Sequence, residues 1–336
     1  MPVRTGRYTL MMEHRPCVQG FASIVGKKES EGPLSKCFDR CYDDTTLGES
    51  SWEKAESRLQ TEAVNEALTK AGVTAKDIDY IFAGDLLNQC ISSTFGLRNL
   101  GIPFLGQYGA CSTMAQTLAL ASIFVETGAA VHTVAVTSSH FCSAERQFRF
   151  PLEYGGQRTP TAQWTATAAG AVVVGNNESG PVISAVTVGR IADLGIKDAA
   201  NMGAAMAPAA AQTLTDFFKD TGTQPKDYDL ILTGDLGLIG SELMEQILMR
   251  DNIDIHNVHN DCGLMIYDRI KQDVHAGGSG CGCSASVLCS TILQQLKQGA
   301  LKNVLFIATG ALMSPTSSQQ GESIPGVAHL VNLKNA

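Results

Sequence analysis

A cysteine at the start of an uncharged run is the first residue of this sequence that could do chemistry. Cys111 lies in "YGACSTMAQTLALA" (108–121), directly after a glycine-bearing turn and before a stretch typical of a buried helix. The free N–H groups at a helix N-terminus carry partial positive charge, which favours anions and lowers the pKa of a thiol. We therefore expect Cys111 to lie in a pocket with a depressed pKa. The alternative is a small residue that fills the core.

Histidines and cysteines of the C-terminal half are further candidates for the same site. His259 lies in "VHNDCG", and His275, Cys281 and Cys283 lie in the glycine-rich segment "HAGGSGCGCSAS". Cys281 and Cys283 are only two residues apart, which is too close for the usual C-x₂-C zinc knuckle, so we predict no metal site. His259 has an alternative interpretation as a hydrogen-bonded core residue, and His275 as a loop residue.

The segment 138–158, "SSHFCSAERQFRFPLEYGGQR", combines cationic and aromatic side chains. Arginine forks suit carboxylates and aromatic faces suit a flat ring, so a flat anion would find both here. The other interpretation is a solvated loop that packs against a dimer partner. The candidate cations are His140, Arg146, Arg149 and Arg158, and the aromatic residues are Phe141, Phe148, Phe150 and Tyr154.

Two internal repeats organise the chain that must position these residues. The stretch "LTKAGVTAKDIDYIFAGDL" (68–86) aligns without gaps with "FKDTGTQPKDYDLILTGDL" (218–236). Further on, "ETGAAVHTVAVTSS" (126–139) resembles "KQGALKNVLFIATG" (297–310). Self-similarity of this kind indicates two copies of one α/β unit. We divide the chain into an N-terminal half, 1–178, and a C-terminal half, 179–336.

Two helices expected at 112–127 and 284–297 determine the architecture. Each carries its first charged residue only near its C-terminus. A helix that is neutral on all sides is packed on all sides, so we expect both helices between two sheets. This predicts an α/β fold with a five-layered αβαβα core. The two helix N-termini, near Cys111 and Gly282, should face a common pseudo-twofold axis.

Composition excludes several classes of partner. The net charge of −8 and the pI near 5.4 argue against nonspecific binding to nucleic acid or to an anionic membrane. Most of the ten cysteines lie inside apolar runs, which favours a reducing compartment. The N-terminus lacks the apolar segment of a signal peptide. The uncharged run 99–125 is interrupted by Pro103 and several glycines, so we expect core rather than a membrane span.

Together these motifs resemble the thiolase and ketosynthase III family over essentially the whole chain. The resemblance rests on the duplicated unit, "GACSTM", "VHNDCG", "HAGGSGCGCSAS" and the closing "NVLFIATGALMSP". It implies that Cys111 stands where the family has its acyl-accepting cysteine, and His259 where ketosynthase III enzymes have a histidine. The third position departs from the family, since Cys281 or Cys283 stands near the expected Asn or Gly-His-Pro. Loss of such an oxyanion donor costs about 3–4 kcal/mol, which puts condensing activity in doubt.

Loop segments are similar to the dipicolinate-binding sporulation members of this family. They are "KKESEGPLSKCFD", "SWEKAESRLQTEAVNEAL" and "SSHFCSAERQFRFPLEYGG". This similarity implies a protein that binds dipicolinic acid (pyridine-2,6-dicarboxylate), free or with calcium, and supports its uptake into the developing spore without a cofactor. The expected ligand-binding residues are Cys111, His259, His275, Cys281, Cys283, His140 and Arg146. The alternative is an acyl-transfer enzyme in which Cys111 is the nucleophile and His259 the acid/base.

The same resemblance implies partners. We expect a homodimer formed through an edge strand at "VHTVAVTSS" (131–139), because edge strands of this fold pair across a twofold axis. We also expect a peripheral location at the spore inner membrane, held there by other SpoVA membrane proteins. No nucleic-acid partner is expected.

Overall fold

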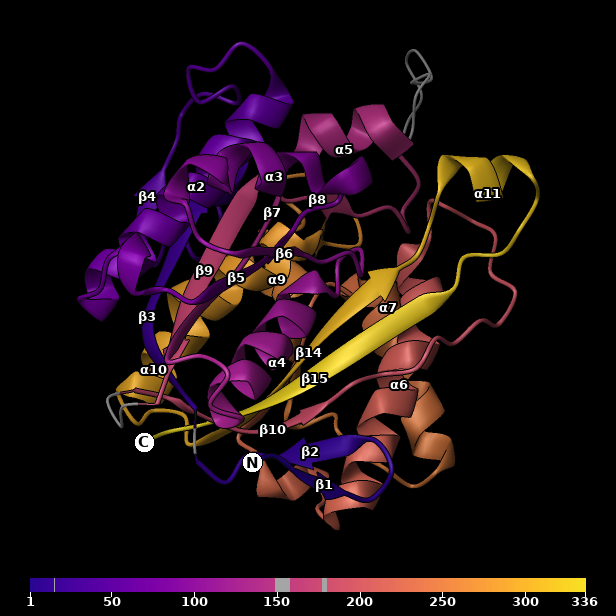
Figure 1. Ribbon diagram of the computed structural model, residues 1–336. Helices are drawn as coiled ribbons and strands as arrows, with labels where there is room; N and C mark the ends of the chain where they lie inside the picture. Colours follow the sequence, from indigo (N-terminus) through magenta and orange to yellow (C-terminus); the bar gives the residue numbers. More distant parts are fainter. Residues whose placement is uncertain (15, 149–157, 177–179) are drawn as a thin grey trace.

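The structure is a computed structural model that describes residues 1–14, 16–148, 158–176 and 180–336, with helices and strands alternating along most of the chain (Figure 1). The strands are β1 Val3–Thr5, β2 Thr9–Met11, β3 Cys17–Val25, β4 Arg40–Cys41, β5 Tyr80–Gly84, β6 Phe104–Gly106, β7 His132–Ser139, β8 Trp164–Thr165, β9 Ala168–Gly175, β10 Val182–Thr187, β11 Leu230–Thr233, β12 His259–Asp261, β13 Gly278–Ser279, β14 Asn303–Ala311 and β15 Gly326–Lys334. The helices are α1 Lys27–Ser30, α2 Trp52–Ala71, α3 Ile91–Leu97, α4 Thr113–Glu126, α5 Phe141–Phe148, α6 Met202–Thr221, α7 Gly237–Arg250, α8 Cys262–Met265, α9 Cys281–Val287, α10 Leu293–Lys297 and α11 Pro315–Gln319.

Ten of the strands form two five-stranded sheets of the same design, which are joined at one edge, and β8 and β13 form a separate two-stranded sheet. The N-terminal sheet has the order β3-β9-β7-β5-β6, and the C-terminal sheet has the order β10-β15-β14-β11-β12. In each, the first three strands are antiparallel neighbours and the last three are parallel neighbours. A single pairing of Cys17 with Val182 joins the two sheets. The matching topology agrees with the internal repeat.

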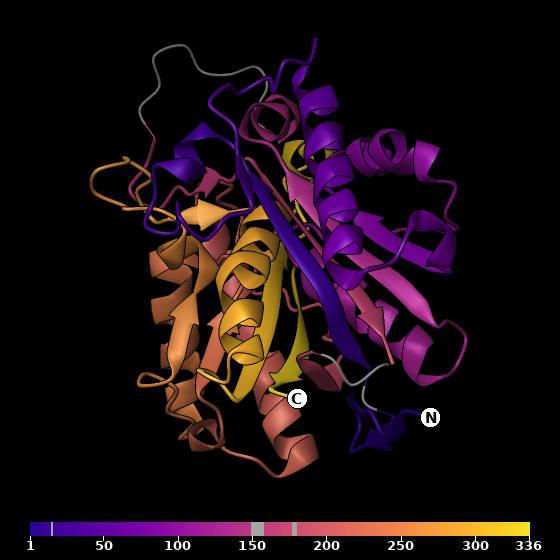
Figure 2. The same cartoon turned by 90° about the vertical axis from the view of Figure 1, so that its left-hand side faces the viewer.

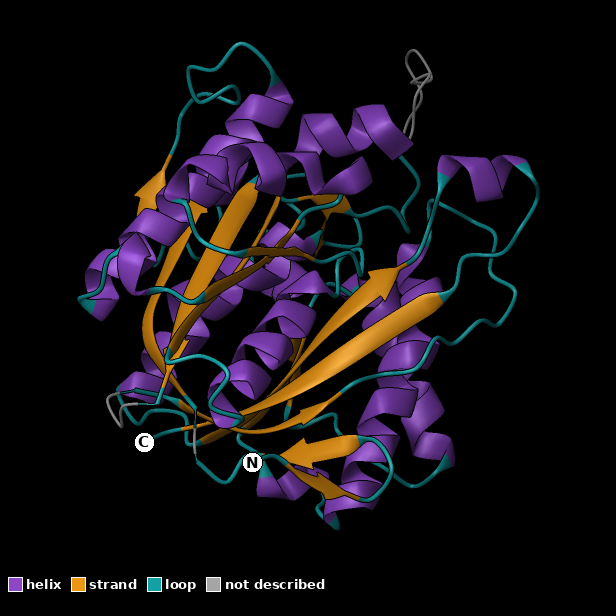
Figure 3. Ribbon diagram, in the orientation of Figure 1, coloured by secondary structure: helices purple, strands orange, loops and turns teal. Residues whose placement is uncertain are grey.

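Helices fill three layers around these sheets. In Figure 1, α2 and α3 lie at the upper left, α6 and α7 at the lower right, and α4 and α9 between them; Figure 2 shows the outer layers from the side. Figure 3 shows that each sheet has helices on both faces. The central layer shares one core with the inner faces of both sheets, in which Met114 and Leu118 of α4 are fully buried. The five-layered αβαβα prediction is confirmed.

Burial explains the uncharged helices. Glu126, at the end of α4, has a side chain with no exposed surface. Its carboxylate accepts hydrogen bonds from the backbone N–H groups of Glu13 and His14. A buried charge is tolerated where hydrogen bonds satisfy it. Among the described residues, every helix is too short or too polar to span a bilayer.

Three expectations about the elements need correction. The second central helix begins at Cys281 rather than at 284, and a π-helical turn at Leu288–Ile292 joins α9 to α10. The strand expected at the sheet edge, β7, lies inside the sheet between β5 and β9. The edge is β6, and its three residues are exposed, although the uncharged run 99–125 that contains them was expected to be core. Its position at the end of the sheet leaves it without a neighbour on one side.

Candidate functional site

Cys111 lies in a tight turn that leads from β6 into α4. The preceding residue, Ala110, has a φ of 51°, a left-handed conformation that residues other than glycine seldom adopt. Several hydrogen bonds hold this turn. Among them, the backbone N–H of Ser112 donates to the carbonyl of Gly109 (3.1 Å), and the hydroxyl of Thr113 donates to the carbonyl of Ala110 (2.6 Å). The chain therefore fixes Cys111 directly before the first turn of α4.

The end of β14 supports this turn from the other half of the chain. A Cβ atom at Gly310 would lie 2.2 Å from the carbonyl oxygen of Gly109. Only glycine allows a backbone approach of this kind. The position of Cys111 thus depends on a contact between the two repeats.

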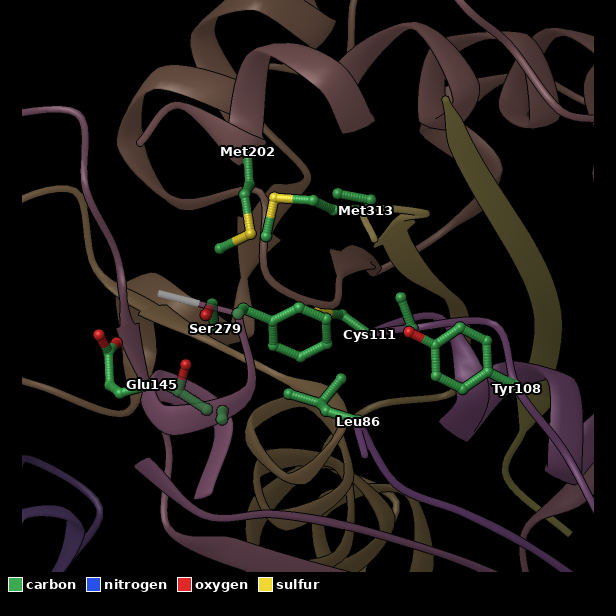
Figure 4. Close-up of a pocket in the computed structure, with 12 residues that line it drawn as sticks. Leu86, Tyr108, Cys111, Glu145, Met202, Ser279 and Met313 are labelled. Carbon is green, nitrogen blue, oxygen red and sulfur yellow. The ribbon is translucent and has the colours of Figure 1, made fainter. Parts of the chain in front are cut away.

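A small cavity lies against Cys111 where the two halves meet (Figure 4). Its volume is about 40 Å³, which is room for a few water molecules. In Figure 4 the thioethers of Met202 and Met313 point into this space from the side opposite Leu86. The lining residues are Leu86, Tyr108, Ala110, Cys111, Ala144, Glu145, Phe148, Thr165, Met202, Ser279, Ala311 and Met313.

The polar lining of the cavity consists mainly of hydroxyl groups. Tyr108, Thr165 and Ser279 each bring one, and Glu145 is the only charged side chain among the described lining residues. Burial raises the pKa of Tyr108 to about 12, so its hydroxyl stays protonated and can donate a hydrogen bond. The cavity can therefore offer donors to an oxygen-bearing ligand.

Asp235 lies directly behind Cys111 and is completely buried. Its carboxylate accepts hydrogen bonds from the thiol of Cys111, from the backbone N–H of Gly280 (2.8 Å) and from the hydroxyl of Thr309 (2.9 Å). Burial raises the pKa of Asp235 to about 7, and the negative charge of Asp261 acts in the same direction. One carboxyl group thus connects three segments around the cavity.

The predicted depression of the Cys111 pKa is wrong. Burial raises the pKa of this thiol, which is 5% exposed. The carboxylate of Asp235 raises it further, by its negative charge and by accepting the thiol hydrogen bond. These effects outweigh the partial positive charge of the helix N-terminus, which is worth up to about 2 kcal/mol in partly buried geometries. Cys111 is therefore a neutral thiol at physiological pH.

Slow alkylation of Cys111 is the chemical consequence. The thiolate is the reactive form of cysteine, so iodoacetamide at neutral pH should modify Cys111 at least about tenfold more slowly than the exposed Cys37. Peptide mass spectrometry after timed quenching measures both rates in one sample. Cys111 reacting as fast as Cys37 or faster would contradict a raised pKa.

The structure brings Cys281 to Cys111 but leaves Cys283 in the core. Cys281 packs with Cys111, Leu86 and Ala144, and its thiol donates to the carbonyl of Ser138 at 2.9 Å. Burial raises the pKa of both Cys281 and Cys283. Cys283 belongs to the central hydrophobic core and does not line the cavity. Cys281 supports the cavity wall from behind.

His259 lies outside the cavity. It begins β12, the outermost strand of the C-terminal sheet. Its Nδ1 lies 2.8 Å from Oε1 of Glu245, and its Nε2 lies 3.0 Å from the hydroxyl of Thr233. Both ring nitrogens are thus engaged away from Cys111. The predicted convergence of His259 with the thiol is not observed.

His140 also points elsewhere. Its Nδ1 accepts a hydrogen bond from the backbone N–H of Cys142 (3.1 Å), so its Nε2 carries the proton and donates to the carbonyl of Thr45 (2.7 Å). Burial lowers the pKa of His140. This histidine is a neutral residue that anchors the 39–50 segment.

The remaining predicted cations are held by local partners. Arg146 forms a salt bridge with Glu53, and His275 lies 3.4 Å from the carboxylate of Asp273 in an external loop. Arg158 lies 4.9 Å above the ring of Trp164. None of the three lines the cavity. The residues Arg149, Phe150 and Tyr154 lie outside the described residues.

Sequence reasoning missed several residues that shape the site. Asp235 carried a signal, because it aligns with Asp85 in the internal repeat, where both end an apolar strand as "GDL". A carboxylate present in both copies at such a place suggests a buried role. The other residues carried no comparable signal, because elements far apart in the sequence bring them to the cavity; they are Tyr108, Thr165, Met202, Ser279 and Met313.

Comparisons with known proteins agree with this architecture. The family model of stage V sporulation protein AD matches residues 6–334. Stage V sporulation protein AD of Bacillus subtilis (strain 168) is 49% identical over 332 residues, which cover 99% of this chain and 98% of that protein.

Solved structures resemble the chain in fold. The 3-oxoacyl-[acyl-carrier-protein] synthase III of Aquifex aeolicus matches with a TM-score of 0.60 and 14% identity over 95% of this chain and 99% of that one. Cerulenin-bound OleA of Xanthomonas campestris matches with a TM-score of 0.61 and 13% identity over 96% of this chain and 97% of that one. At these identities the likeness establishes a ketosynthase III-like fold.

Proposed function

Because the chain belongs to the stage V sporulation protein AD family, we propose that it binds dipicolinic acid in the cavity beside Cys111 and supports its uptake into the developing spore. In this proposal the protein is peripheral at the spore inner membrane and is held there by SpoVA membrane proteins. The cavity then acts as a binding site that has kept the shape of an enzyme pocket.

The state of Cys111 is the observation that carries the proposal. The thiol faces the cavity, yet it donates its hydrogen to Asp235, and burial keeps its pKa high. A nucleophilic cysteine needs a base or a depressed pKa. Among the described residues that line the cavity there is no histidine, and the carboxylate of Asp235, which accepts the thiol hydrogen, raises the pKa of Cys111. This favours binding over acyl transfer.

The lining suits a flat ring that bears carboxylates. The hydroxyls of Tyr108, Thr165 and Ser279 can donate hydrogen bonds to carboxylate oxygens, and the thioethers of Met202 and Met313 can pack on a ring face. A cavity of about 40 Å³ leaves little free space beside Cys111. Methionine side chains have several rotatable bonds, so we expect Met202 and Met313 to move aside on binding.

A calorimetric titration tests the proposal against its alternative. The protein is titrated with dipicolinate and, separately, with acetyl-CoA, and the acetyl-CoA sample is then analysed by mass spectrometry. We expect saturable binding of dipicolinate and no acylated Cys111. Acyl-enzyme formation with turnover, together with no heat from dipicolinate, would support the acyl-transfer enzyme instead.

We also propose a homodimer, formed through β6 rather than through the strand at 131–139. The apolar side chains of Phe104 and Leu105 on this edge strand are each 39% exposed, and Phe95 and Tyr108 nearby are 57% and 45% exposed. An exposed apolar strand edge is a ready surface for pairing with a second chain. Antiparallel pairing of two β6 strands would cover these side chains.

A single charged side chain on β6 should be enough to break the proposed dimer. Leu105→Asp should shift the mass measured by light scattering at micromolar concentration from dimer to monomer, because it buries a charge in an apolar interface. The matched control is Ile270→Asp, at a position that is 91% exposed in a loop, and it should stay dimeric. A monomeric mass for the wild-type protein would rule the dimer out.

A further inference from the structure

The cavity beside Cys111 is poorly prepared for a doubly charged ligand. Glu145 is the only charged side chain among its described lining residues, and it is negative. Moving an anion out of water without compensating charge is strongly unfavourable. The hydroxyls of Tyr108, Thr165 and Ser279 supply hydrogen bonds but no positive charge. The described lining therefore leaves a dianion without a compensating positive charge.

Asp235 is the ionisable group placed to respond to a charge in the cavity. It lies behind the wall and accepts hydrogen bonds from three segments of that wall. They are Cys111 itself, Gly280, which follows the lining residue Ser279, and Thr309, which is two residues before the lining residue Ala311. A negative ligand against Cys111 is thus separated from the carboxylate by one side chain.

The other groups around Asp235 leave its charge unbalanced. Those that face it are Cys111 before α4, Asp261 of β12, Cys262 of α8, and Cys281 and Cys283 of α9. None of these described groups is a cation. Burial and the charge of Asp261 raise the pKa of Asp235 to about 7. A second negative charge nearby raises a carboxyl pKa further.

We propose that Asp235 takes up one proton from solvent when dipicolinate enters the cavity beside Cys111, and releases it when the ligand leaves. The proton binds a carboxylate oxygen of Asp235, and no covalent bond to the ligand forms. The inference rests on the proposed function and adds to it the way in which the site reduces its own negative charge when a dianion binds. It makes Asp235 a positioning residue, which acts through Cys111, Gly280 and Thr309.

Proton uptake makes the affinity depend on pH. Above the pKa of Asp235 each pH unit should lower the affinity by up to about tenfold, because one proton must be bound with each ligand. Asp235→Asn replaces the carboxyl group with a neutral amide of the same shape. Its affinity for dipicolinate should stay within about threefold between pH 7 and about pH 9, where that of the wild type falls.

The experiment is a series of calorimetric titrations with dipicolinate in two buffers that differ in their heat of ionisation. The difference in the observed heat gives the number of protons bound per ligand. We expect uptake that approaches one proton in the wild type at about pH 8 and none in Asp235→Asn. The matched control, Asp254→Asn at an exposed position, should behave as the wild type.

A second variant keeps the proposal testable if Asp235→Asn fails to fold. Thr309→Val removes a hydrogen bond that stabilises the charged carboxylate, so the fall in affinity should begin at higher pH. Each titration is run with a chelator and again with calcium. Binding without proton uptake, or binding only with calcium, would overturn the inference alone. No binding under any condition would overturn the proposed function and the inference with it.

Discussion

Replacing Cys111 with tryptophan is expected to abolish dipicolinate binding while the protein still folds. The side chain of Cys111 forms part of the wall of a cavity of about 40 Å³, so an indole ring would occupy the space that the ligand needs. We expect a loss of at least about a hundredfold in affinity, or roughly 2.7 kcal/mol. Cys111→Ala should cost less than about tenfold, because the thiol donates to Asp235 rather than to the ligand.

Matched variants distinguish a loss of binding caused by a filled cavity from a loss of binding caused by unfolding. Cys37→Trp, at an exposed cysteine, should bind as the wild type does. Met313→Trp fills the same cavity from another loop and should also block binding if Cys111→Trp proves unstable. Calorimetry gives the affinities, and thermal unfolding shows that each variant is folded. Unchanged affinity in a folded Cys111→Trp protein would place the ligand elsewhere. Spores that carry only this variant should contain little dipicolinate.

The stability of the protein is expected to fall as the pH rises from about 5 to about 9, in part through Glu56. This carboxyl group is fully buried, and burial together with the charge of Asp85 raises its pKa to about 8. It accepts hydrogen bonds from the hydroxyls of Ser138 (3.0 Å) and Ser143 (2.8 Å). The folded protein thus holds a proton that the unfolded chain has released above its ordinary pKa of 4.5.

Because the folded protein binds this proton more tightly than the unfolded chain, the stability that Glu56 contributes decreases as the pH rises. The stabilisation is fully present below about pH 4.5 and is lost as the pH rises through about 8. One group changes the free energy of unfolding by up to about 1.4 kcal/mol per pH unit within that window. Glu56→Gln removes the titration and keeps a carbonyl acceptor for one of the two hydroxyls, while its NH2 group can donate to the oxygen of the other. Its stability should therefore vary less with pH.

Urea unfolding of wild type and Glu56→Gln at several pH values measures the effect. The control is Glu322→Gln, at an exposed position, which should follow the wild-type profile. Parallel profiles for wild type and Glu56→Gln would show that Glu56 ionises normally in the folded protein.

The sequence predicted the five layers of the fold well, because helices that are buried on all sides contain few charged residues. The helices at 112–127 and 284–297 lack charge almost throughout, and only a position between two sheets explains that. The internal repeat likewise anticipated two sheets of one design. Cys111 could be placed before a helix because a glycine-bearing turn and an apolar run adjoin it.

The chemistry of the site could not be predicted from the sequence, because it depends on contacts between residues that are far apart in the chain. His259 lies at the start of β12, and the strand order puts β12 at the far edge of its sheet. Strand order is a long-range property that no local motif encodes. The pKa of Cys111 depends on Asp235, which is more than a hundred residues away in the chain. The sequence around Cys111 indicates the helix N-terminus, which lowers the pKa of the thiol. It does not indicate the burial and the Asp235 carboxylate, which raise that pKa more strongly.

A crystal structure of the protein with dipicolinate at saturating concentration tests the central claim most directly. The account predicts the ring in the cavity, in contact with Cys111 and with Met202 and Met313 turned outward. It also predicts carboxylate oxygens within hydrogen-bonding distance of at least one of the hydroxyls of Tyr108, Thr165 and Ser279. Ligand density at another place on the protein, with the cavity beside Cys111 unchanged, would contradict the account.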